Sequence, residues 1–112
     1  MKPIAVLAAV SGAIAVAAGA FGAHAAQGEA AGWLRTGGEY QLIHAVAALV
    51  AVRMGARGAA WLFVGGAAVF AGSLYLMALG LPRWLGAVTP LGGAALIGGW
   101  LWLAWRAGRT GA

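Results

Sequence analysis

The sequence contains no cysteine and no aspartate, and its only carboxylate side chains are those of Glu29 and Glu39. Without cysteine, neither a disulfide framework nor a thiolate metal site is possible. Charged residues make up only 8% of the 112 residues, whereas 63% are hydrophobic and are spread along the whole chain. A soluble domain of this size would need more charge to cover its surface. The composition therefore predicts helices that face lipid.

Basic residues outnumber acidic ones by seven to two and give a net charge of +5. They stand singly at the ends of apolar runs and do not form the basic patch typical of nucleic-acid binding. We therefore expect no nucleic-acid partner. We expect the basic residues to set the membrane topology and to contact membrane lipids.

Four apolar runs predict an all-α protein, a single integral membrane domain built as a four-transmembrane-helix bundle. The expected spans are residues 3–24, 38–56, 59–80 and 87–106, and a helix of ~20 residues crosses a hydrocarbon core of ~30 Å. Lys2 and Ala23-His24-Ala25 also resemble a secretory signal peptide, but three more apolar runs follow. The apolar part of the second run is short. We therefore expect the aliphatic stem of Arg53 to lie in the hydrocarbon region while its guanidinium reaches the membrane surface.

Residues 25–38 are expected to form a polar loop before the second span. Within it, Thr36 would be the N-cap of the next helix and Glu39 would complete a capping box. Two starts are possible for the fourth span. Thr89 caps a helix that begins at Pro90, or the helix begins near Arg83 and kinks at Pro90.

Basic residues also predict the orientation. Four spans place both termini and the second loop on one side, and that side carries Lys2, Arg53, Arg57, Arg106 and Arg109. The other side carries only Arg35 and Arg83. Because lysine and arginine gather on the cytoplasmic side of membrane proteins, both termini are predicted to be cytoplasmic.

Small residues recur at intervals of three and four in the predicted spans, where they allow two helix backbones to approach closely. The glycines expected at such helix contacts are Gly19, Gly22, Gly65, Gly72, Gly92 and Gly93.

The predicted topology places polar residues of all four spans at one depth, near the non-cytoplasmic face, with Ser11 as the exception. The candidate polar cluster comprises His24, Glu39, Tyr40, Gln41, His44, Ser73, Tyr75 and Thr89. In one interpretation these groups satisfy one another, since an unpaired polar group in lipid is costly. In the other they mark a binding site or a proton-transfer step.

Enzymatic chemistry has little support in the sequence. Ser11 is expected to lie far from both histidines, and no acid is placed to orient His44 beside Ser73. A metal ion at His24 and His44 would need a third ligand, and only the two glutamates offer carboxylates. We therefore expect no catalytic residue, no metal and no cofactor. Small multidrug-resistance exporters carry a glutamate in the first span, which this chain lacks.

Several short motifs follow one another in a specific order. They are Gly19-Ala20-Phe21-Gly22-Ala23-His24, Trp33-Leu34-Arg35-Thr36-Gly37-Gly38-Glu39-Tyr40-Gln41 with His44, Gly72-Ser73-Leu74-Tyr75, Val88-Thr89-Pro90-Leu91-Gly92-Gly93 and Gly99-Trp100. With this set the chain resembles an uncharacterised family that includes small bacterial inner-membrane proteins, catalogued as domain of unknown function 423. Its first loop is shorter than in many members. The resemblance implies a four-span bundle in the inner membrane and supplies no reaction.

We interpret the chain as a multi-pass inner-membrane protein of non-enzymatic character, with a packing, helper or envelope-associated role. Its expected partners are membrane lipids and either a second copy or another membrane protein. The alternative is a protein that binds or transports a small solute, a proton or an ion through His24, Glu39, His44 and Tyr75.

Overall fold

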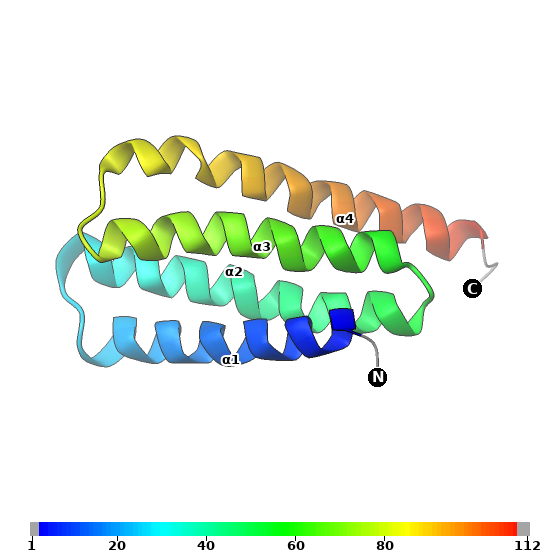
Figure 1. Ribbon diagram of the computed structural model, residues 1–112, viewed down its shortest axis with the longest axis horizontal. Helices are drawn as coiled ribbons and strands as arrows, with labels where there is room; N and C mark the ends of the chain where they lie inside the picture. Colours follow the sequence, from blue (N-terminus) through cyan, green and yellow to red (C-terminus); the bar gives the residue numbers. More distant parts are fainter. Residues whose placement is uncertain (1–2, 110–112) are drawn as a thin grey trace.

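The computed structural model describes residues 3–109, which fold into four α-helices joined by short turns (Figure 1). The helices are α1 (Pro3–His24), α2 (Gly28–Arg53), α3 (Arg57–Ala78) and α4 (Thr89–Arg109). A short 3-10 helix, η1 (Arg83–Ala87), precedes α4. This described range contains no strand, so the predicted all-helical class is confirmed.

Neighbours in sequence are neighbours in space. Helix α1 packs against α2, α2 against α3, and α3 against α4, while α1 and α3 meet over a smaller area. The chain therefore runs back and forth, with α2 and α3 in the middle and both described ends of the chain at one end of the bundle (Figure 1). Helix α4 lies along α3 at the edge, away from α1.

Small side chains fill most of the interior, and many large apolar side chains point outward. The main cluster of buried residues consists of Ile4, Ala8, Ala47, Ala48, Ala51, Ala56, Ala59, Ala60, Phe63, Ala67 and Leu96. Exposed apolar residues such as Phe21, Ile43 and Leu101 cover the outside. This distribution matches a protein whose surroundings are as apolar as its interior. Three segments are long and apolar enough to cross a membrane: α1, α3, and η1 together with α4.

Helix α2 begins ten residues earlier than expected. Only residues 25–27 connect it to α1, so the predicted polar loop over residues 25–38 is wrong. The residue before the helix is Gln27, and Thr36 and Glu39 lie inside the helix, which rules out the predicted capping box. Gly37 and Gly38 are buried in helix contacts, and packing outweighs their low helix propensity.

The start of α4 combines the two alternatives left open by the sequence. Residues Arg83–Ala87 do form a helical turn, but it is a 3-10 turn, and a separate α-helix starts at Thr89 with Pro90 in its first turn. Proline is tolerated there because the first amides of a helix have no partner within it.

Candidate functional site

Gln41 and His44 lie near the middle of α2, because the helix extends ten residues further toward α1 than the sequence suggested. Both side chains are buried, with 5% and 6% of their surface exposed. The expectation that they begin the second helix is therefore wrong, because both lie well inside it.

One hydrogen-bonded chain joins the first three helices. The hydroxyl of Tyr75 on α3 donates to Oε1 of Gln41 over 2.7 Å, and Nε2 of Gln41 donates to Oγ of Ser11 on α1 over 3.1 Å. Sequence reasoning set Ser11 apart from the polar cluster, whereas the structure places it in direct contact with Gln41. Helical periodicity places Ser11 on the same face of α1 as Ala15, and this spacing was the signal in the sequence that Ser11 could face another helix.

Gly37 makes room for the ring of Tyr75. A Cβ atom at position 37 would lie 2.6 Å from Cε1 of Tyr75, closer than van der Waals contact permits. Gly37 and Gln41 share a face because they are one turn apart on α2. Gly37 leaves space for the ring of Tyr75, and Gln41 accepts the hydrogen bond from its hydroxyl.

A second set of bonds surrounds His44. The indole N–H of Trp100 on α4 donates to Nε2 of His44 over 3.0 Å, and Nδ1 of His44 lies 2.6 Å from the carbonyl oxygen of Tyr40. Because an indole nitrogen can only donate, Nε2 must accept, and Nδ1 then carries the proton donated to Tyr40. The arrangement fits a neutral imidazole. Phe63 packs on this histidine with its ring centroid 5.6 Å away.

The third polar contact joins α3 to the start of α4. The hydroxyl of Ser73 donates to the carbonyl oxygen of Phe70 over 2.9 Å, and its oxygen lies 2.5 Å from Oγ1 of Thr89. With the serine proton engaged by Phe70, the threonine hydroxyl is the donor in the second bond. Thr89 therefore binds Ser73 across two helices.

Within residues 3–109, every buried side-chain nitrogen and oxygen atom has a hydrogen-bond partner. Three separate sets of bonds thus replace the single predicted cluster: Ser11–Gln41–Tyr75, Tyr40–His44–Trp100 and Phe70–Ser73–Thr89. We call these three sets the interhelix network. The predicted cluster did not include Trp100, because the sequence does not show which acceptor its indole N–H meets.

Three members of the predicted cluster contribute no side chain to the interhelix network. His24 is the last residue of α1 and is exposed, and Glu39 is exposed on α2. Tyr40 takes part only through its backbone carbonyl, and its side chain is exposed. In the described part of the chain, the side chains of His24 and Glu39 form no hydrogen bond or ion pair. That same range holds no group of three His, Cys, Asp or Glu side chains placed to bind a metal ion.

Comparison with known proteins identifies the family. A family model described as "Protein of unknown function (DUF423)" matches residues 18–93, which is more than half of the chain. The chain belongs to the DUF423 family. The matched range contains Gln41, His44, Ser73 and Tyr75, and it leaves out Ser11 and Trp100. No solved structure matches the chain.

Relatives of this DUF423 protein occur in distant bacteria. The UPF0382 inner membrane protein YgdD of Escherichia coli K12 is 42% identical over 106 residues, covering 85% of this chain and 81% of YgdD. The UPF0382 membrane protein YwdK of Bacillus subtilis 168 is 38% identical over 114 residues, covering 90% of this chain and 92% of YwdK. The predicted multi-pass, inner-membrane location is confirmed by these relatives and by the apolar helices.

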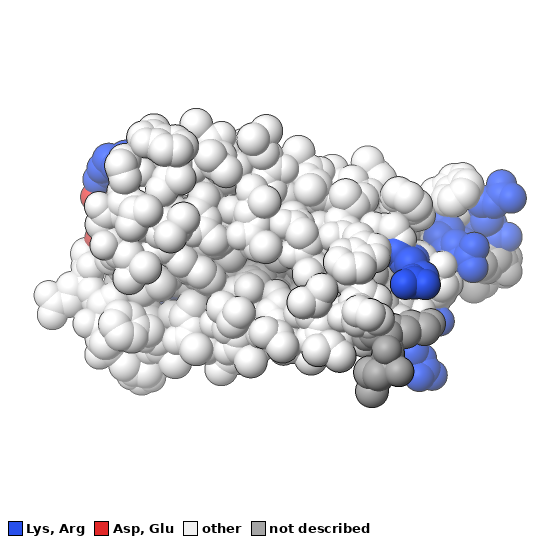
Figure 2. All heavy atoms as spheres, viewed as in Figure 1, with Lys and Arg blue, Asp and Glu red and all other residues white. Residues whose placement is uncertain are grey.

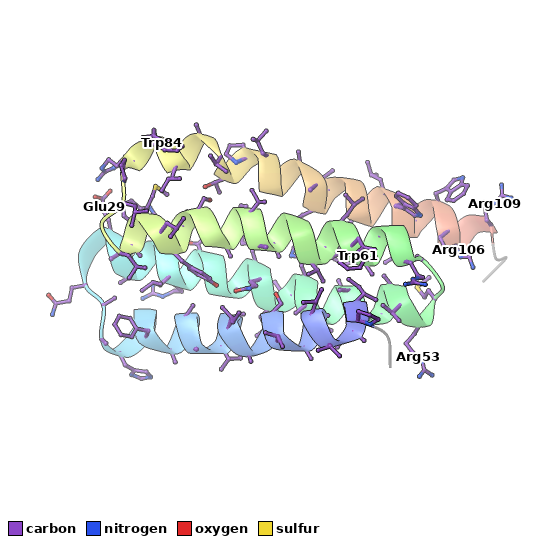
Figure 3. The ribbon with its side chains drawn as sticks, in the orientation of Figure 1. Glu29, Arg53, Trp61, Trp84, Arg106 and Arg109 are labelled. Atoms are coloured by element: carbon purple, nitrogen blue, oxygen red, sulfur yellow. The ribbon has the colours of Figure 1, made fainter. Side chains whose placement is uncertain are left out.

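The two ends of this DUF423 protein differ in charge. Arg53, Arg106 and Arg109 lie at the end where the described chain begins and ends, and blue spheres gather there in Figure 2 (residues labelled in Figure 3). At the opposite end, Arg83 forms an ion pair with Glu29, and its guanidinium lies 5.6 Å from the ring centroid of Trp33. This ion pair was not anticipated from the sequence, since its partners are 54 residues apart.

The six glycines predicted to lie at helix contacts differ in how closely neighbouring atoms approach them. A Cβ at Gly22 would lie 3.0 Å from Cβ of Leu34, and one at Gly92 would lie 2.4 Å from the backbone nitrogen of Phe70, so both mark close contacts. Gly93 makes only ordinary contact with Phe70, 3.8 Å away. A Cβ at Gly19, Gly65 or Gly72 would meet nothing within 4 Å, so no side chain is excluded there within the protomer. The close glycines that were not predicted include Gly37, Gly38, Gly58, Gly66 and Gly99.

Proposed function

We propose that this protein is a four-span inner-membrane protein, with both termini in the cytoplasm, that acts through helix contacts as a packing or helper protein. The observation that carries this proposal is the interhelix network, whose polar groups use one another as partners. In the described residues it leaves no buried polar side-chain atom open to a substrate.

The length of α2 supports a fourth span. Arg53 lies twenty positions after Trp33, which corresponds to ~30 Å of helix and to the thickness of a hydrocarbon core. Tryptophan and arginine are the residues expected at the two interfaces. The polar residues Gln41 and His44 face neighbouring helices, which shield them from lipid.

The charge distribution supports the orientation. Arg53, Arg57, Arg106 and Arg109 belong to the end of the bundle at which the described chain begins and ends. The opposite end carries Arg83, whose charge is matched by Glu29, and Arg35. The positive-inside rule then places both termini in the cytoplasm.

The character of the buried groups supports a role without catalysis or transport. Proton carriers use ionisable side chains that line a water-filled cavity. In contrast, His44 is held in one tautomer between Tyr40 and Trp100. The groove beside it, of about 440 Å³ between α2 and α4, is lined by apolar residues such as Ile43, Val46 and Leu103.

Cross-linking in native membranes tests the proposal. A photoreactive amino acid at exposed positions on α1 and on α4 is expected to capture a protein neighbour, either a second copy or another membrane protein. The carrier alternative would be correct if two results were found together. The photoreactive positions would capture only lipid, and the reconstituted protein would carry a proton or solute flux that His44→Ala abolishes.

A further inference from the structure

Glu39 occupies an unusual position on the outside of α2. It lies about 9 Å further along the helix than Trp33, at ~1.5 Å per residue, which in the proposed four-span arrangement is inside the hydrocarbon region. Its side chain is exposed, and no hydrogen bond or ion pair is recorded for it among residues 3–109. The other carboxylate, Glu29, is paired with Arg83 at the helix end. A carboxylate facing lipid is costly, and the described structure shows no ion pair for Glu39, so a cation from a second chain would lower that cost.

Arg35 shares the face of α2 on which Glu39 lies, since the two are one turn apart. Both line a groove of about 440 Å³ between α1 and α2. No ion pair joins them in the described structure, where the recorded pair is that of Arg83 with Glu29. The α1 wall of the groove is made of small side chains, including Ala15, Gly19 and Ala20. The groove thus presents one positive and one negative group beside a surface that a helix can approach closely.

We propose that this groove is the interface of a homodimer, in which Arg35 of each copy pairs with Glu39 of the other copy. The proposal rests on the four-span, helix-contact function argued above and names the partner as a second copy of this chain. A two-fold axis along the membrane normal keeps both copies in the same orientation, as a membrane requires. Such an axis pairs residue i with j and j with i, so one Arg–Glu pair generates two ion pairs.

A second copy fits the groove better than a phospholipid does. A lipid phosphate can reach Arg35, which lies only two residues beyond the interfacial Trp33 on α2. Glu39 lies one turn deeper, at the level of the acyl chains, which offer it no cation. An arginine from another copy offers both the charge and a long apolar stem that crosses this depth. The open space next to Gly19, where a Cβ would meet nothing within 4 Å, leaves room for the second helix.

Charge reversal tests the pairing directly. The dimer population in lipid nanodiscs, measured by native mass spectrometry and by single-molecule photobleaching, is compared for the unmodified chain, R35E, E39R and the double variant R35E/E39R. Each single reversal is expected to weaken the dimer by roughly tenfold or more, and the double variant is expected to restore it. Helix content by circular dichroism confirms that the single variants fold. An unmodified chain that stays monomeric, or single reversals that dimerise equally well, would overturn the proposal.

Cysteine cross-linking maps the face, because the chain has no cysteine of its own. Ala20→Cys in the groove is expected to form a disulfide between two copies on oxidation in membranes. The control Ala94→Cys is exposed on α4, at a similar distance from the same end of the bundle, and is expected to remain monomeric. Cross-links from Ala20 to a different membrane protein would overturn the homodimer while leaving the helix-contact function standing. Absence of a cross-link from Ala20 would also overturn the homodimer, whereas the helix-contact function is tested separately by photocapture from α1 and α4.

Discussion

Helix α2 is more buried than its polar composition suggests, whereas helix α4 is less buried than its apolar composition suggests. Helix α2 carries both glutamates, yet it holds eight buried residues and packs against helices on two sides. Helix α4 holds three buried residues and packs along α3. Even so, the segment containing α4 is apolar enough to cross a membrane by itself, and α2 is not among the segments that are. Between these two helices, the more apolar one is therefore the less buried one.

Both helices combine side-chain hydrogen bonds with close glycine contacts, and one example of each shows the difference between these interactions. Helix α2 is joined to its neighbours by side-chain hydrogen bonds through Gln41 and His44. Helix α4 approaches α3 through glycine, with Gly92 directly against the backbone of Phe70. Close packing and interhelix hydrogen bonds are the two forces available in lipid, where apolar side chains gain nothing by leaving the solvent. Single substitutions can separate these two forces.

Gly92→Ala is expected to have the largest effect. The added Cβ would lie 2.4 Å from the backbone nitrogen of Phe70, and backbone cannot move aside as a flexible side chain can. Separating α4 from α3 in this way should lower the free energy of unfolding in detergent by roughly 1–3 kcal/mol. Gly65→Ala is the matched control, because a Cβ there meets nothing within 4 Å. Equal stability of the two variants would contradict the assignment of Gly92 as the close contact.

Gln41→Leu is expected to have an intermediate effect on α2. It removes the partner of both Tyr75 and Ser11 and should lower the free energy of unfolding by about 1–2 kcal/mol. Gln27→Leu, in the exposed turn before α2, serves as the control and should be near neutral. A double-mutant cycle with Tyr75→Phe measures the coupling directly. A coupling energy of zero would mean that the Gln41–Tyr75 hydrogen bond contributes nothing.

Trp100→Phe is expected to have the smallest effect, because it removes one bond between α4 and α2 and keeps an aromatic ring beside Phe63. We expect a loss of about 0.5–1 kcal/mol, with Trp84→Phe on the exposed part of η1 as the control. The indole ¹⁵N–¹H signal of Trp100 should also shift in His44→Ala. An unchanged signal would show that His44 is not its acceptor.

Helix ends were predicted more accurately where they depend on neighbouring residues in the sequence than where they depend on contacts with other helices. The predicted end of the third span at residue 80 lies close to the observed end of α3 at Ala78, and Gly80 has the positive φ of 98° that glycine adopts readily. The start of α2 was misplaced because residues 25–38 contain several polar side chains and because Thr36 and Glu39 fit a capping box. The roles of Gly37 and Gly38 inside α2 depend on Tyr75 and on the backbone of Ala15, which are distant in sequence.

The candidate site shows the same division. Helical periodicity predicts that Tyr40, Gln41 and His44 share one face, but in the structure Gln41 and His44 are buried and Tyr40 is exposed. It could not show that this face meets Ser11 on one side and Trp100 on the other, because those contacts depend on how helices pack. The misplaced start of α2 put Tyr40, Gln41 and His44 at the beginning of that helix, and it kept Glu39 in the role of a capping residue.

Composition and the spacing of apolar runs alone determined that this chain is helical and lies in a membrane, because lipid requires every backbone hydrogen bond to close within a segment. Tertiary structure alone decided which polar groups meet and which glycines are needed. Those outcomes depend on the rotation and register of each helix against its neighbours. In lipid these are set by steric fit and by pairs of hydrogen-bonding side chains, such as Gln41 with Tyr75, that lie far apart in the sequence.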